Sequence, residues 1–107
     1  MKTFNLIQQK SCWIKQMHYK NNALAILVGN RKNGIFAHLS INLPSSEFLD
    51  NDQFFIEKTE EHMIIVRKLV VMGLIEVVQE VPYKGFGAFA LYKKLPKMEE
   101  YTKEERK

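Results

Sequence analysis

The stretch 29–44, GNRKNGIFAHLSINLP, constrains the fold more than any other part of this chain. Asn33 and Gly34 tolerate the positive φ angles of a tight turn. Residues 35–43 then alternate in the manner of a strand with one covered face, and Pro44 ends the strand because proline has no N–H to donate. The predicted covered face consists of Ile35, Ala37, Leu39, Ile41 and Leu43, and the opposite face of Phe36, His38, Ser40 and Asn42. With the apolar run 23–28 before it, this stretch predicts a β-hairpin.

The rest of the chain supplies further strands and one helix. Strands are expected over residues 3–8, 74–81 and 88–93, and the ambiguous segment 11–19 is also interpreted as a strand. Thr59 is the expected N-cap of a helix that runs to about Met72 and ends at Gly73. A turn is expected over residues 82–87. The order strands, helix, strands predicts an α+β fold, an antiparallel sheet of about five strands with one main helix packed on one face.

Length and composition indicate one globular domain. At 107 residues with 46% apolar side chains, the chain suits a single core. We expect an α+β domain over residues 1–96 and a charged tail, frayed or disordered, over 97–107. The one cysteine excludes an internal disulfide and favours a reducing cytoplasm. No apolar run approaches the length of a signal peptide or a membrane span, so we expect no membrane association.

Charge is distributed unevenly along the chain. Residues 1–46 contain six basic side chains and no acidic one. Residues 47–80 contain eight acidic and three basic side chains, and the remainder is basic again. Because a surface of one sign attracts partners of the other sign, this asymmetry says more about binding than the net charge of +4.

The candidates for chemistry are few. The histidines, His18, His38 and His62, lack the spacing of a helical metal site, and Cys12 alone cannot form a zinc knuckle. Cys12 with His18 or His38 would make a nucleophile and its base, but nothing supplies a third group or an oxyanion site. The sequence therefore predicts a protein that is not an enzyme and that uses no metal and no cofactor.

Two charged surfaces are the candidate binding sites. Basic and aromatic residues together suit single-stranded nucleic acid, with cations on phosphates and rings on bases. This first set comprises Lys10, Trp13, Lys15, Tyr19, Lys20, Arg31 and Lys32. The second set suits a basic groove on another protein, and comprises Glu47, Asp50, Asp52, Glu57, Glu60 and Glu61. The alternatives are that the aromatic residues belong to the core and that the acidic segment is a solvated loop.

Two apolar residues interrupt the polar stripe of the predicted helix. Ile64 and Val71 fall among Glu60, Arg67 and Lys68 at 100° per residue. Either a loop or the tail covers them, or they form an exposed contact surface such as a homo-oligomer interface.

Several segments together carry a family resemblance. They are YKNNALAILV, FAHLSINLP, the acidic link containing phenylalanines, LVVMGLIE and GFGAFALYKKLP, between Tyr19 and Pro96. With them the chain resembles a small family of uncharacterised proteins encoded on conjugative elements and plasmids of Firmicutes and related gut bacteria. Residues 88–92, AFALY, lack the first tyrosine of the family's last strand, and QFFIEK stands where a proline often follows the acidic link.

The resemblance implies a counter-defence role, since small proteins of mobile elements are often anti-CRISPR or antirestriction inhibitors. It implies an anti-CRISPR-like protein that inhibits by stoichiometric binding to an RNA-guided nuclease of the Cas9 type, or to its guide RNA. The alternative is a nucleic-acid-binding accessory protein of plasmid or conjugative-element maintenance or transfer, with RNA or DNA as the partner.

Overall fold

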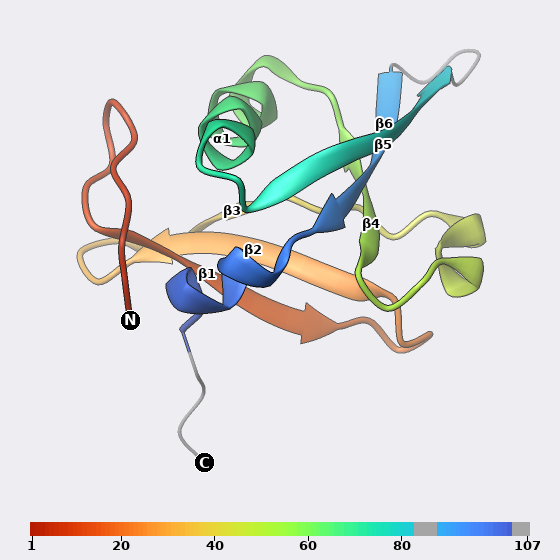
Figure 1. Ribbon diagram of the computed structural model, residues 1–107, viewed down its shortest axis with the longest axis horizontal. Helices are drawn as coiled ribbons and strands as arrows, with labels where there is room; N and C mark the ends of the chain where they lie inside the picture. The colour runs from red at the N-terminus through yellow and green to blue at the C-terminus, as the bar shows by residue number, and fades with distance from the viewer. Residues whose placement is uncertain (83–87, 104–107) are drawn as a thin grey trace.

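The computed structural model describes residues 1–82 and 88–103, which adopt an α+β fold (Figure 1). Within these residues, six strands form two antiparallel sheets of three strands each. The first sheet has the order β1-β2-β3 and consists of β1 (Cys12–His18), β2 (Leu24–Asn30) and β3 (Gly34–His38). The second sheet has the order β4-β6-β5 and consists of β4 (Gln53–Glu57), β5 (Ile75–Pro82) and β6 (Ala88–Lys94). The helices are α1 (Glu60–Val71) and the short 3₁₀ helices η1 (Pro44–Phe48) and η2 (Pro96–Tyr101).

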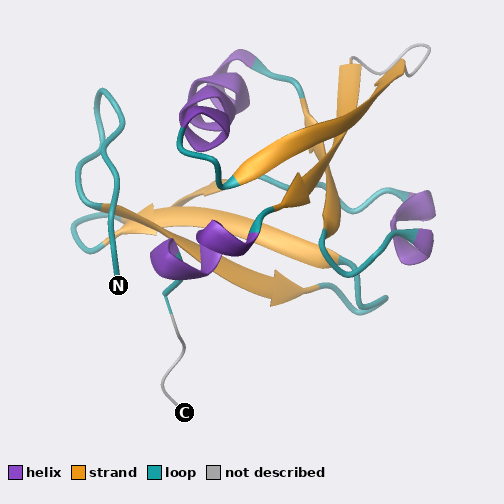
Figure 2. Cartoon of the chain, viewed as in Figure 1, coloured by secondary structure: helices purple, strands orange, loops and turns teal. Residues whose placement is uncertain are grey.

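One core lies between the two sheets and the helix. Figure 2 shows α1 and the second sheet on the same side of the first sheet. The side chains that fill this space come from every layer, because alternate residues of each strand and one stripe of α1 face inward. They include Ile14, Ile26 and Val28 of the first sheet, Phe54, Ile56 and Tyr92 of the second, and Ile65, Val66 and Leu69 of α1.

The α+β class and the single main helix are confirmed. Thr59 caps α1 by accepting a hydrogen bond from the backbone N–H of His62 (3.1 Å), and Gly73 follows the helix with a φ of 74°. The strands, however, divide into two sheets instead of forming one. The sheets approach each other where Ile41 N donates to Phe55 O (2.9 Å), an isolated bridge beyond the end of β3. The turn predicted over residues 82–87 lies largely outside the described residues.

The prediction of a first strand over residues 3–8 is wrong. Only Phe4 forms a bridge, with Cys12, and the chain then reverses direction. Leu6 N donates to Gln9 O (2.8 Å), and the side chain of Asn5 accepts a hydrogen bond from Ser11 N (2.9 Å). Local turn hydrogen bonds therefore override the apparent strand pattern.

The predicted faces of residues 35–43 need a correction as well. Val28 pairs with Ala37 and Gly29 with Ile35, so Phe36 is the extra residue of a β-bulge. The bulge exchanges the faces of two residues: Ile35 is 41% exposed, whereas Phe36 packs against the core. Ala37 and Leu39 lie on the core side, as predicted. The strand ends at His38, and both Leu39 N and Ser40 N donate to Ile26 O.

The first part of the predicted tail, residues 97–103, packs against β1. Met98 of η2 is fully buried in the core. Lys103 N donates to Ile14 O (2.7 Å), and Thr102 forms a parallel bridge with Ile14. The N-terminal residues meet the same segment, since Lys2 Nζ lies 2.7 Å from a carboxylate oxygen of Glu100. Residues 104–107 of the predicted tail lie outside the described residues.

Two carboxylates of this segment predict a pH dependence of stability. Hydrogen bonds from Gln16 and Lys94 lower the pKa of Glu99, and the hydrogen bond and charge of Lys2 lower the pKa of Glu100. A lowered folded-state pKa stabilises the fold above the ordinary Glu value of about 4.3, and this contribution is lost as the pH falls through the folded-state pKa. We expect the double variant Glu99→Gln/Glu100→Gln to have a slightly lower Tm than the wild type at pH 7. The effect is small because both carboxylates are largely exposed.

Thermal melts of both proteins between pH 7 and pH 2 check this dependence. The difference in Tm should shrink as the pH falls below about 4.3 and the wild-type carboxylates become protonated. A difference in Tm that stays constant, or widens, at low pH would contradict the stabilising role of the ionised Glu99 and Glu100 carboxylates.

Candidate nucleic-acid interface

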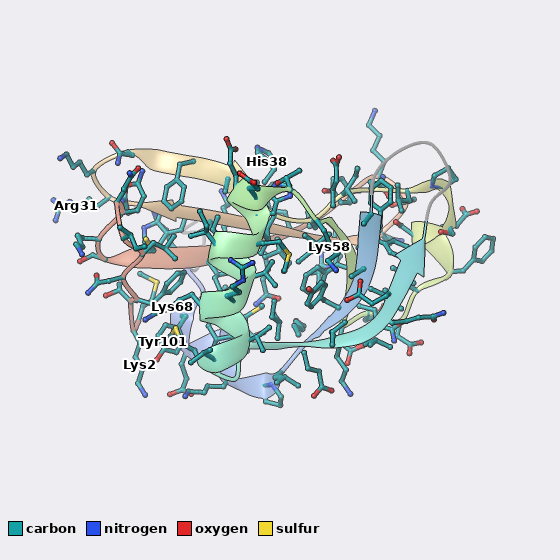
Figure 3. The ribbon with its side chains drawn as sticks, turned by 90° about the horizontal axis from the view of Figure 1, so that it is seen from above. Lys2, Arg31, His38, Lys58, Lys68 and Tyr101 are labelled. Atoms are coloured by element: carbon teal, nitrogen blue, oxygen red, sulfur yellow. The ribbon has the colours of Figure 1, made fainter. Side chains whose placement is uncertain are left out.

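Three predicted cations, Lys10, Arg31 and Lys32, meet at one end of the first sheet. Arg31 and Lys32 lie in the turn between β2 and β3, and Lys10 lies in the N-terminal turn that precedes β1. All three line one shallow hollow. Figure 3 shows Arg31 projecting at one end of the molecule, far from Lys58 and the β4–α1 connection.

A buried asparagine holds these two turns together. The Asn30 side chain, only 3% exposed, donates to Gln9 Oε1 (2.9 Å) and to Lys10 O (3.2 Å). Its own oxygen accepts from Asn33 N (2.8 Å), and Asn33 Nδ2 donates to Gln9 Oε1 (2.7 Å). Because these four hydrogen bonds share the side chains of Gln9, Asn30 and Asn33, they fix the two turns relative to each other and keep Lys10 beside Arg31 and Lys32. Sequence reasoning missed Gln9 and Asn30, whose roles depend on this tertiary contact.

A second hollow adjoins the first and shares Ser11, Asn30 and Arg31 with it. Its floor includes Trp13 and Ile35, which share one face of the sheet because each pairs with Gly29. Lys15 and Lys103 are also among its lining residues. We call the two hollows together the basic groove, with Lys10, Lys15, Arg31, Lys32 and Lys103 as its cations. No Asp or Glu is among the described residues that line it.

Trp13 lies in the groove but is largely covered. Its side chain is 7% exposed, and Lys103 Nζ lies over the indole ring, 4.7 Å from the centroid. Cation–π contact explains this position of Lys103. The sequence does not indicate this contact, because Lys103 lies in the predicted tail, 90 positions from Trp13.

Tyr19 and Lys20 lie away from the basic groove. They occupy the turn between β1 and β2, at the opposite end of the two strands from Trp13 and Gly29. The Tyr19 hydroxyl lies 3.2 Å from both the carbonyl and the hydroxyl of Ser40, so it anchors the segment after β3. Of the predicted basic and aromatic set, the structure therefore brings together Lys10, Trp13, Lys15, Arg31 and Lys32, and separates Tyr19 and Lys20 from them.

The predicted acidic set is divided by a strand. Glu47, Asp50 and Asp52 precede β4, whereas Glu57, Glu60 and Glu61 lie at its end and in the first turn of α1. Five residue steps along a strand separate Asp52 from Glu57 by about 17 Å. The second group also lies among cations, since Lys58 and Arg67 line the same hollow as Glu60, and Lys58 pairs with Glu80 (2.9 Å). The six carboxylates form two groups and not one continuous track.

The two helix residues Ile64 and Val71 are exposed, at 50% and 85%. Within residues 1–82 and 88–103, neither a loop nor the C-terminal segment covers them. Val77 and Val78 of β5, an edge strand, are also about half exposed. A homo-oligomer through this apolar surface stays a prediction.

The side chains considered for chemistry are dispersed. Cys12 is fully buried, its thiol donates to Gln9 O (3.4 Å), and burial raises its pKa, which disfavours the reactive thiolate. His18 lies at the other end of β1 from Cys12. His62 Nδ1 lies 2.7 Å from Glu57 O at the start of α1. Within residues 1–82 and 88–103, no cluster of three or more His, Cys, Asp or Glu side chains is suited to a metal ion.

No helix in the described part of the chain is both long enough and apolar enough to cross a membrane. Searches against protein-family models, curated proteins and solved structures found no match to this chain.

Proposed function

We propose that this protein is a non-catalytic nucleic-acid-binding protein that holds a phosphate backbone in the basic groove. The observation that carries the proposal is the convergence of Lys10, Arg31, Lys32 and Lys103, from three separate segments, on two adjoining hollows. Lysine and arginine side chains that neutralise phosphates release counterions, and this release provides most of the affinity of sequence-independent binding.

The geometry of the charges supports this function over capture of a basic protein groove. An acidic mimic of nucleic acid needs a continuous row of carboxylates, but here β4 separates the two acidic groups. The basic groove, by contrast, is continuous through Arg31 and is fixed by the Asn30 hydrogen bonds. A role as an accessory of plasmid or conjugative-element maintenance or transfer agrees with this surface.

Charge reversal in the groove should weaken nucleic-acid binding. For the variant Arg31→Glu/Lys32→Glu we expect at least a roughly tenfold loss of affinity for a labelled oligonucleotide at about 0.1 M salt. The slope of log K against log salt concentration should decrease in magnitude by about 0.7 to 0.9 for each phosphate contact removed. Fluorescence anisotropy titrations at several salt concentrations measure both quantities.

The matched control is Lys20→Glu/Lys68→Glu, which changes the net charge equally at two exposed positions outside the groove. This control should keep most of the affinity and the salt slope. If it weakens binding as much as the groove variant, net charge and not the groove governs the interaction. If the wild-type protein binds neither RNA nor DNA, the proposed function is wrong.

A second candidate function is that of an anti-CRISPR-like inhibitor, and the basic groove favours one that binds the guide RNA. Since the groove and not the acidic set is continuous, we expect such an inhibitor to contact the guide RNA of an RNA-guided nuclease such as Cas9. Co-elution should then require the guide and be lost in Arg31→Glu/Lys32→Glu. Binding that persists without the guide, and that is abolished by reversing Asp50, Asp52, Glu60 and Glu61 to Lys, would assign the contact to the acidic side chains instead.

A further inference from the structure

The contact of Lys103 with Trp13 indicates which form of nucleic acid the groove takes. We infer that the groove binds single-stranded nucleic acid, and that a base replaces the Lys103 ammonium on the Trp13 ring. This inference rests on the proposed function, since it concerns the ligand of the same groove. A duplex presents phosphates and sugars on its outside, and its stacked bases cannot reach an indole ring.

The floor of the groove is suited to a base. Trp13 and Ile35 flank Gly29 on one face of the first sheet, and Ile35 is 41% exposed although it is apolar. Cations adjoin this apolar floor, with Arg31 on the β2–β3 turn and the Lys103 ammonium over the Trp13 ring. Alternating apolar and cationic surface matches a single strand, whose bases and phosphates alternate in space.

Lys103 covers the ring by a contact that is easily exchanged. The backbone of this residue is fixed, because Lys103 N donates to Ile14 O at 2.7 Å. The residue itself is exposed, and its ammonium can swing away from the ring while the backbone stays in place. Stacking of a base on an aromatic ring is comparable in strength to the cation–π contact that it replaces, and the exposed Lys103 ammonium is hydrated once it leaves the ring.

After the exchange, the Lys103 ammonium is free to contact a phosphate. The Lys103 backbone is held at Ile14, the residue after Trp13, so we expect the displaced ammonium to stay close to the phosphate of the stacked nucleotide. The same side chain thus shields Trp13 in the free protein and contributes a phosphate contact in the complex. A duplex would gain only the phosphate contacts and would leave Lys103 on the ring.

The experiment uses the fluorescence of Trp13, the one tryptophan of the chain. The full-length protein is titrated with an oligonucleotide of about 12 nucleotides, a length within the site sizes of single-strand-binding domains. The same oligonucleotide annealed to its complement is the second probe. We expect the single strand to quench Trp13 emission and to bind about tenfold more tightly than the duplex.

The variants Lys103→Ala and Lys97→Ala test the role of the ammonium. Both remove one exposed lysine from the C-terminal segment, but only Lys103 contacts Trp13. In the free protein, Lys103→Ala should increase the quenching of Trp13 by acrylamide. In the binding titration, it should decrease the magnitude of the slope of log K against log salt concentration by about 0.7. Lys97→Ala should change neither quantity, and both variants should keep the preference for the single strand.

The outcomes separate this inference from the proposed function. Equal affinity for both probes without a change in Trp13 emission would overturn the inference and leave nucleic-acid binding in place. A Lys103→Ala variant with unchanged acrylamide access and an unchanged salt slope would overturn the exchange. Failure to bind either probe would overturn both proposals.

Discussion

Replacing Met98 by alanine should lower the free energy of unfolding by about 2 to 5 kcal/mol, the range for large-to-small substitutions in a core. Met98 is fully buried, although its neighbours in η2 are charged and exposed. It packs into the same core as the two sheets and α1. Truncation at Cβ removes its hydrophobic contacts and leaves a cavity beneath the C-terminal segment. Urea unfolding followed by circular dichroism measures the change.

The same substitution at an exposed strand position provides the control. Met17 on β1 is 43% exposed, and Met17→Ala should change the free energy of unfolding by no more than about 0.5 kcal/mol. Equal losses in the two variants, or a Met98→Ala protein as stable as the wild type, would show that η2 does not belong to the core.

Met98 also illustrates what the sequence could not reveal about the fold. Two apolar residues within KMEEY, Met98 and Tyr101, are too few to establish a period, so the sequence predicts a charged tail over residues 97–107. The hairpin and the helix were predictable because their signals are local: an Asn-Gly turn, a Thr cap and a terminal glycine. Division of the strands into two sheets depends on long-range pairing, such as the Ile41–Phe55 bridge, which no local pattern encodes.

The candidate site was predictable in part for the same reason. Arg31 and Lys32 are neighbours in the sequence, and their place in a turn followed from GNRKNG. Lys10 joins them through the pairing of Cys12 with Asn30 and the hydrogen bonds of Gln9 and Asn30, and Lys103 comes from the C-terminal segment. Lys20, in contrast, is close to Lys15 in sequence but lies beyond the far end of β1. Proximity in the sequence therefore wrongly includes Lys20 in the basic surface and omits Lys103 from it.

The shape of the groove also depends on Gly29, which has no side chain and lets Trp13 lie close to the sheet. A Cβ built on this residue would lie 2.6 Å from Gly34 O and 2.7 Å from Trp13 Cη2. Replacing glycine by alanine where the backbone permits usually stabilises a protein by about 0.4 to 1 kcal/mol. At Gly29 we expect the opposite sign, because neither contact can persist at such a distance and overpacking costs about 1 to 3 kcal/mol.

Relief of this clash should be visible at Trp13. The Gly34 oxygen belongs to the backbone of β3, which is paired with β2, so the indole ring has to move farther than the strand. The emission spectrum of Trp13 should therefore shift in the folded Gly29→Ala protein. The control is Gly34→Asn. No atom lies within 4 Å of a Cβ at Gly34, and asparagine tolerates the positive φ of 66° better than other side chains do. Gly34→Asn should thus leave the Trp13 emission unchanged. A Gly29→Ala protein at least as stable as the wild type, with unchanged emission, would mean that Trp13 does not rest on this glycine, and the floor assigned to the groove would then be wrong.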